Sequence, residues 1–220
     1  MTRTMKVLSA ALVGIWLLQV LTNSAEVPFG AFRWLTLKPS AVLEGHELWR
    51  VATYAVLGNP ADVVAILLDV MILLIFGSAL EERAGRGRAL AAMFAVSVFG
   101  ALAVLAASRV DLSLLHAQVV GSSAAMSALI VAWGVQRAEE RLSFFGAFEL
   151  RGKHFAMVVA AMTVVSFLLN RSGAHVASVA GLVAGLFVAR LGPRTPKAPP
   201  RKRVGGHLRV VPEDPKRYLN

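Results

Sequence analysis

Two short groups of residues have the types and spacing that serine chemistry needs. Gly121-Ser122-Ser123-Ala124 places small residues and hydroxyls near the start of an apolar segment, and Gly173-Ala174-His175 opens the last apolar segment. A serine hydroxyl becomes an effective nucleophile when a base within hydrogen-bond reach takes its proton, and a Ser-His pair suffices where the site orients the imidazole. The hypothesis is that Ser123 is a nucleophile and His175 is its general base.

A helix that begins at Ser123 would also help to stabilise a negatively charged intermediate. The N–H groups of the first helical turn have no partner within the helix, and the positive end of the helix dipole favours a developing oxyanion. Gly121 would let a substrate approach the backbone closely. The alternative is structural: Ser122 and Ser123 pack between helices with their hydroxyls bonded to carbonyls, and His175 donates to a neighbouring helix.

The composition predicts an integral membrane protein. Of 220 residues, 56% are hydrophobic and 16% are charged, and the mean hydropathy is +0.63; soluble domains of this size seldom carry so little polar surface. Most apolar runs approach the length of about 20 residues that a bilayer requires. The predicted fold class is an all-α, polytopic bundle of six transmembrane helices, at 7–21, 63–80, 89–107, 119–135, 155–169 and 174–191.

The basic residues predict the orientation of this bundle. With the N-terminus inside, 18 of the 23 Lys and Arg residues fall on the inner side, so both termini are expected in the cytoplasm, as in a bacterial inner membrane protein. Ser123 and His175 then lie on the same, outer side at similar depth. The first apolar run is read as an uncleaved helix, and the alternative is a cleaved signal peptide.

The chain divides into a membrane domain at 1–191 and a basic, proline-rich cytoplasmic tail at 192–220. The tail is expected to contact anionic lipids, and its lack of interleaved aromatic residues argues against nucleic-acid binding. The absence of cysteine excludes disulfides and thiol catalysis. No HExxH motif or paired carboxylates at ligand spacing occur, so neither a metal nor a cofactor is predicted.

Small residues predict how the helices pack. The fourth helix carries a run of small residues in its first turns, which lets neighbouring backbones approach closely, so it is expected at the centre of the bundle. Gly181 and Gly185 form a small-xxx-small pair in the sixth helix. We expect this pair to contact the fourth helix and to bring Ser123 and His175 together.

Over 48–191 the chain resembles the rhomboid family of intramembrane serine proteases. The matching motifs, in chain order, are Leu48-Trp49-Arg50, Phe76-Gly77 through Gly85, Gly121-Ser122-Ser123-Ala124 and Gly173-Ala174-His175. The resemblance implies that Ser123 is the nucleophile, His175 the general base, and the backbone N–H groups of Ser122 and Ser123 part of the oxyanion hole. It also implies that the partners are transmembrane proteins, cut near the outer end of a membrane-spanning segment.

The second helix departs from the family pattern. Where the family has a histidine and, four residues later, an asparagine that donate to the oxyanion, this chain has Ala65 and Asp69. Alanine donates nothing, and an ionised aspartate only accepts hydrogen bonds, so it would repel the intermediate unless it is protonated. Asp69 could instead bond a neighbouring helix or orient His175. In the fourth helix, Ala124 replaces a glycine and Ser127 replaces a frequent aromatic residue.

The sixth helix can be aligned in two registers. Aligning Gly181 and Gly185 with the family's two glycines puts Ser178 at the base position, whereas aligning Gly173-Ala174-His175 retains a histidine there, and we prefer the second register. His116 precedes Ser123 on the same side, where an interfacial polar role is expected.

The leading hypothesis is an intramembrane serine endopeptidase with a Ser123–His175 dyad. The alternative is a catalytically inactive relative that binds transmembrane helices, and a third, weaker reading is a small transporter or scaffold.

Overall fold

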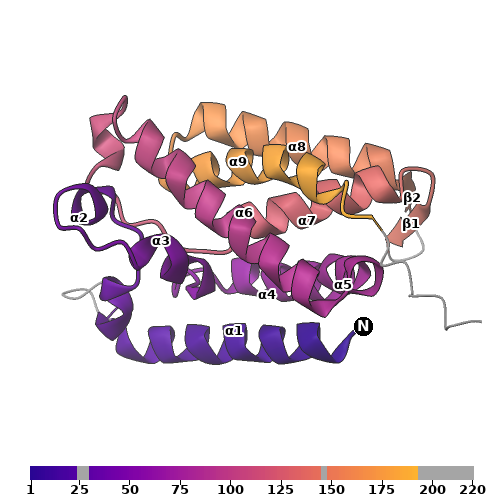
Figure 1. Cartoon of the computed structure of the whole chain (residues 1–220), viewed down its shortest axis with the longest axis horizontal. Coiled ribbons are helices and arrows are strands. Elements are labelled where there is room, and N and C mark those ends of the chain that lie inside the picture. The colour runs from indigo at the N-terminus through magenta and orange to yellow at the C-terminus, as the bar shows by residue number, and fades with distance from the viewer. Residues whose placement is uncertain (24–29, 145–147, 193–220) are drawn as a thin grey trace, which may run out of the picture.

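The computed structural model describes residues 1–23, 30–144 and 148–192. Helices dominate it, in an order broadly like the one predicted (Figure 1). The elements are α1 (Arg3–Thr22), η1 (Gly30–Trp34), α2 (Pro39–Leu43), α3 (Arg50–Thr53), η2 (Tyr54–Val56), α4 (Val63–Ile72), η3 (Leu73–Gly77), α5 (Ser78–Ala84), α6 (Arg86–Ala107), η4 (Leu112–Leu114), α7 (Ser123–Gln136), β1 (Arg141–Phe144), β2 (Phe148–Arg151), α8 (Gly152–Leu169) and α9 (Gly173–Val188).

The long helices have the dimensions of membrane spans. In the described residues, four helical segments are long and apolar enough to cross a bilayer, namely α1, the continuous helix from Val63 to Ala84, α6 and α8. Two shorter apolar helices, α7 and α9, have 14 and 16 residues. The prediction of a polytopic, all-α membrane fold is confirmed.

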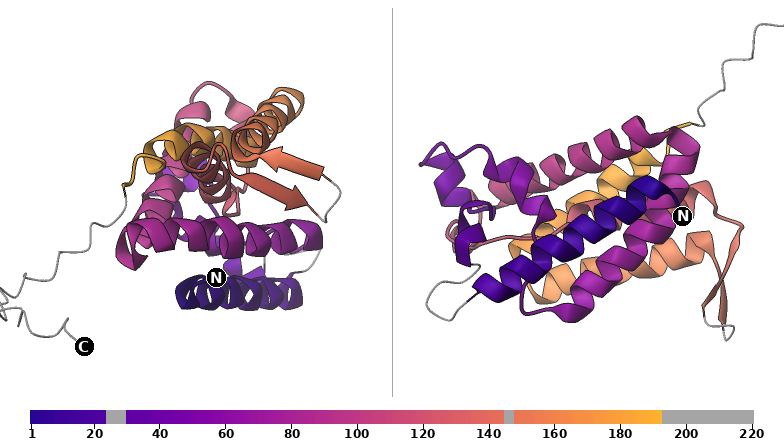
Figure 2. Two further views of the ribbon diagram at one scale, coloured as in Figure 1. Left: turned by 90° about the vertical axis from the view of Figure 1, so that its right-hand side faces the viewer. Right: turned by 90° about the horizontal axis from the view of Figure 1, so that it is seen from below.

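Helix α7 lies at the centre of the bundle, as expected from its small residues (Figures 1 and 2). Every residue from Ala124 to Gly134 is buried. In α8, by contrast, only 11% of the most apolar stretch is buried against protein. The outer helices therefore present apolar side chains to the membrane, while α7 is surrounded by protein.

Two glycines of α9 allow its backbone to touch that of α7. A Cβ at Gly181 would lie 2.1 Å from the carbonyl oxygen of Ala124, and one at Gly185 would lie 2.8 Å from that of Ala128. No side chain fits at such distances, so the contact requires glycine. The predicted packing of the Gly181–Gly185 pair on the fourth helix is confirmed, and it fixes the rotation of α9 relative to α7.

The second membrane helix contains a π-helical turn. Here η3 lies between α4 and α5, and the chain then turns at Gly85, which has a φ of 86°. Phe76 of this turn packs edge-on against Trp133 of α7, with ring centroids 5.2 Å apart. In α5, Glu81 accepts hydrogen bonds from the hydroxyls of Thr2 and Thr4, which ties α5 to the start of α1.

Arg50 organises the first loop. Its side chain is buried, donates to the carbonyls of Arg33 and Thr36 at 2.8 and 2.7 Å, and pairs with Glu47. Since a buried charge is costly without partners, these contacts explain why an arginine follows Trp49 at this position.

The structure adds one element, a short β-hairpin, to the predicted bundle. Strands β1 and β2 pair antiparallel between α7 and α8, a hairpin that the sequence did not predict. The predicted tail at 192–220 lies, from residue 193 onward, outside the described residues.

Substitution of Gly181 should break the contact between α7 and α9. We expect Gly181→Val to lower the free energy of unfolding by about 1–3 kcal/mol, because the valine side chain would meet backbone atoms of α7 that cannot move aside easily. Thermal unfolding in detergent measures this. Gly14→Val is the matched control, since a Cβ at Gly14 meets no atom within 4 Å; equal melting temperatures for the two variants would contradict the proposed contact.

Candidate active-site pocket

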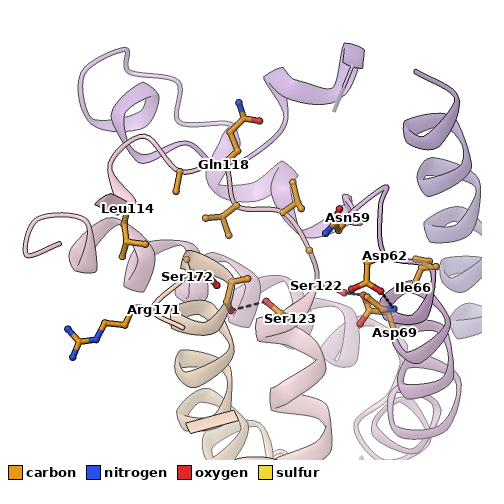
Figure 3. A pocket seen from close by; sticks show the side chains of 18 of the residues that line it. Asn59, Asp62, Ile66, Asp69, Leu114, Gln118, Ser122, Ser123, Arg171 and Ser172 are labelled. Carbon is orange, nitrogen blue, oxygen red and sulfur yellow. Dashed lines mark hydrogen bonds between the residues drawn. The ribbon is translucent and has the colours of Figure 1, made fainter. Parts of the chain in front are cut away.

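A polar pocket opens between the ends of α4, α7 and α9 (Figure 3). Its volume is about 580 Å³. Its polar lining side chains are Asn59, Asp62, Asp69, Ser113, Gln118, Ser122, Ser123, Arg171 and Ser172. The N-terminal ends of α4, α7 and α9 thus meet at one pocket, as the predicted topology requires.

Gly121 makes the turn that leads into α7. Its φ is 111°, a region that favours glycine, and its N–H donates to the carbonyl of Tyr54 at 3.2 Å. The Tyr54 hydroxyl donates to the carbonyl of Ser97 in α6 at 2.7 Å, and burial raises the pKa of this phenol. Tyr54 therefore anchors the Gly121 turn to the bundle, which places Ser122 and Ser123 at the first turn of α7.

Ser122 and Asp69 form a hydrogen bond on one side of the pocket. The Ser122 hydroxyl donates to the Asp69 carboxylate at 2.7 Å. Ser122 is buried and Asp69 is partly buried, and both line the pocket (Figure 3). The sequence-level expectation that Asp69 bonds a neighbouring helix is met by this contact, and its hydrogen bond goes to Ser122 rather than to His175.

Ser123 faces the first turn of α9. Its hydroxyl donates to the carbonyl oxygen of Ala174 at 3.4 Å, and the hydroxyl of Ser178 donates to the same oxygen at 2.9 Å. The Ser123 and Ser178 hydroxyls are therefore no further apart than the sum of these two distances. Ser178, the residue that the glycine-based alignment places at the base position, shares this acceptor with Ser123, and the described residues show no hydrogen bond between the two hydroxyls.

His175 makes a different contact. Its Nδ1 lies 2.7 Å from the hydroxyl of Ser172, the N-cap residue of α9. Within the described residues, the hydrogen bonds include none between Ser123 and His175, and the imidazole does not line the pocket. The sequence reasoning did not single out Ser172, although a serine at the N-cap, three residues before a polar side chain, is a recognisable pattern.

The rim of the pocket is held by polar contacts from neighbouring segments. Gln19 of α1 is fully buried, and its amide exchanges two hydrogen bonds with the backbone of Gly58, at 3.0 and 3.2 Å. Across the pocket, Ser113 donates to Asp111 through its hydroxyl and its N–H, and these bonds lower the pKa of the Asp111 carboxyl. Gln19 therefore ties the segment at Gly58 to α1, while the Ser113–Asp111 bonds hold their own loop in shape.

The other histidines do not contribute to the pocket. His116 is exposed and does not line it, as expected for an interfacial residue. His46 and His154 are also exposed, and His207 lies outside the described residues. Among the residues that the structure describes, no group of His, Asp and Glu could hold a metal ion.

The fold and the pocket define a polytopic membrane protein with serine hydroxyls at a shared polar pocket. A family model described as the Rhomboid domain matches residues 45–194. The chain belongs to the rhomboid family, which includes intramembrane serine proteases and inactive relatives. A search of curated proteins gave no match to the sequence.

The hydrogen bond between Ser122 and Asp69 should contribute measurably to stability. In a double-mutant cycle with Ser122→Ala and Asp69→Ala, we expect a coupling energy of about 1–2 kcal/mol, because each single change leaves a polar group in the bundle without its partner. Unfolding in detergent would be measured for all four proteins. The exposed Arg137–Glu140 pair is the control and should show almost no coupling; a coupling for Ser122 and Asp69 that is no larger would contradict the contact.

Proposed function

We propose that this rhomboid-family protein binds transmembrane helices at its outer pocket without cutting them. One observation carries the proposal: the hydroxyls of Ser123 and Ser178 share the carbonyl of Ala174, while the His175 imidazole contacts Ser172. In this arrangement, the Ser123 hydroxyl donates to a backbone carbonyl, and the described residues show no hydrogen bond between it and an imidazole. A backbone carbonyl does not act as a base near neutral pH, so this acceptor would not take the proton from Ser123.

The two side-chain oxyanion donors of the family pattern are also missing near Ser123. Ala65 and Asp69 occupy the positions where the family has a histidine and an asparagine, and both line the pocket. Removing one such donor costs roughly 10²- to 10³-fold in rate. A carboxylate that already accepts from Ser122 adds negative charge where the intermediate would carry it. Both changes argue against catalysis for the same electrostatic reason.

The same pocket suits recognition of a polar group in a transmembrane segment. Its lining includes the carboxylates of Asp62 and Asp69 and the side-chain amides of Asn59 and Gln118. Polar groups are rare in membrane helices and require partners there. A membrane helix with a basic or donor-rich side chain near its outer end would find acceptors in this pocket.

The proposed orientation follows from the charge distribution. Both termini lie in the cytoplasm, and the pocket opens toward the outer side of a bacterial cytoplasmic membrane. The basic tail at 192–220 then faces the anionic inner leaflet. Membrane lipids and transmembrane proteins are the proposed partners.

A second candidate function is proteolysis through the predicted Ser123–His175 dyad. Ser123 begins α7 in an open pocket, and its present acceptor, the Ala174 carbonyl, belongs to the residue directly before His175. For catalysis, the His175 ring would have to leave Ser172 and reach Ser123. That prediction stays open to the labelling experiment below.

A serine-directed fluorophosphonate separates the two functions. We expect the wild-type protein in detergent to be labelled no more than Ser123→Ala and His175→Ala, because Ser123 lacks a base. Combining Ser178→His with Ala65→His and Asp69→Asn should restore labelling, and adding Ser123→Ala should abolish it again. Labelling of the wild-type protein that is lost in both Ser123→Ala and His175→Ala would establish the dyad and overturn our proposal.

Binding is tested with synthetic transmembrane peptides in bilayers. A photo-crosslinker at Gln118 should capture a Leu/Ala helix of about 20 residues several-fold more when a lysine replaces one leucine near its outer end. Asp69→Asn should reduce this preference. The control crosslinker is at Leu102, an exposed residue of α6 that does not line the pocket. Equal capture from both positions, or recovery of cut peptide, would contradict helix binding without cleavage.

A further inference from the structure

A second polar pocket lies at the opposite end of the bundle, between α1 and α6. Its volume is about 480 Å³, and it is lined by Arg3, Thr4, Val7, Leu8, Ala11, Arg86 and Leu90. Helices α1 and α6 both begin at this end of the molecule (Figures 1 and 2). We call this surface the α1–α6 groove.

The groove has a charged end and an apolar end, like the headgroup and acyl chains of a phospholipid. The two arginines stand at the starts of the two helices, and the apolar side chains follow deeper along the same helices. At a rise of 1.5 Å per residue, Arg3 and Ala11 lie about 12 Å apart along α1, close to the thickness of one leaflet's hydrocarbon layer, about 15 Å. A headgroup at the arginines would therefore place its acyl chain along Val7, Leu8, Ala11 and Leu90.

The charge of the groove is available to an anion. Arg3 and Arg86 are exposed, and neither takes part in an ion pair recorded for the described residues. The described lining of the groove contains no acidic side chain. Glu81 of α5 accepts hydrogen bonds from the hydroxyls of Thr2 and Thr4, and it does not line the groove. Two guanidinium groups suit a phosphodiester, which accepts hydrogen bonds from both.

We propose that the α1–α6 groove binds one anionic phospholipid of the inner leaflet. Arg3 and Arg86 hold the phosphate, and one acyl chain lies between α1 and α6. This proposal is independent of the outer pocket and of the function assigned to it.

The groove leads toward the outer pocket through the bundle. Leu8 and Leu90 also line an inner, mostly apolar cavity of about 180 Å³, whose lining includes Ser122. Ser122 in turn lines the outer pocket and bonds Asp69. A bound acyl chain would therefore border, at Leu8 and Leu90, the cavity that Ser122 also lines.

The test compares lipid retention by the full chain in nanodiscs. Native mass spectrometry of protein released from mixed phosphatidylglycerol and phosphatidylcholine discs measures which lipid stays bound. We expect one phosphatidylglycerol to be retained preferentially. Arg3→Gln and Arg86→Gln should each lower this preference about fivefold, while the double control Lys6→Gln/Arg88→Gln should leave it nearly unchanged, because neither residue lines the groove.

A second variant separates a specific site from general charge attraction. Ala11→Trp should fill the apolar part of the groove and release the lipid while both arginines remain. Melting temperatures near wild type would show that the variants fold. Equal loss in the Lys6/Arg88 control, equal retention of phosphatidylcholine, or unchanged retention in Ala11→Trp would each overturn the proposal.

Discussion

Backbone contact between α7 and α9 determines where the polar groups of the pocket around Ser122 and Ser123 lie. Gly181 and Gly185 admit the carbonyls of Ala124 and Ala128 at distances that no other residue tolerates. Two helices in such contact can neither rotate nor slide without a clash, so the residues one turn nearer the pocket are fixed as well. The Ser123 hydroxyl therefore meets the Ala174 carbonyl, and the polar pocket takes its chemistry from this register.

The polarity of the pocket follows from three residue types at that register. In our proposal, Ser123 has a backbone carbonyl as its acceptor and no base, and Ala65 and Asp69 stand where the family pattern has donors. The geometry of a helix N-terminus remains, with Gly121 making the turn into α7. We propose that the carboxylates of Asp62 and Asp69 suit this pocket to binding a polar membrane segment rather than to stabilising an oxyanion.

Much of the fold could be predicted because long apolar runs in the sequence indicate membrane helices. The central position of α7 and its contact with Gly181 and Gly185 were also predictable, since small residues mark close helix packing. The hairpin of β1 and β2 was not, because strands of four residues leave too short a pattern. Membership of the rhomboid family was predicted from four ordered motifs and is confirmed.

The site was predictable only in part. The sequence located Gly121, Ser122 and Ser123 at the start of a central helix, and it favoured His175 over Ser178 at the base position. Which of the two side chains serves Ser123 depends on the rotation of α9, which local sequence does not determine. The contact between Ser172 and His175 was not predicted, because the imidazole was expected to contact Ser123.

Our proposal requires that the Ser123 hydroxyl lies nearer to Ser178 than to the imidazole of His175. Because the natural chain contains no cysteine, cysteine pairs can be introduced without background. A short thiol-to-thiol crosslinker applied to the protein in bilayers should join Ser123→Cys to Ser178→Cys efficiently and join Ser123→Cys to His175→Cys poorly. Preferential crosslinking of positions 123 and 175 would contradict the register and with it the proposed loss of the catalytic dyad.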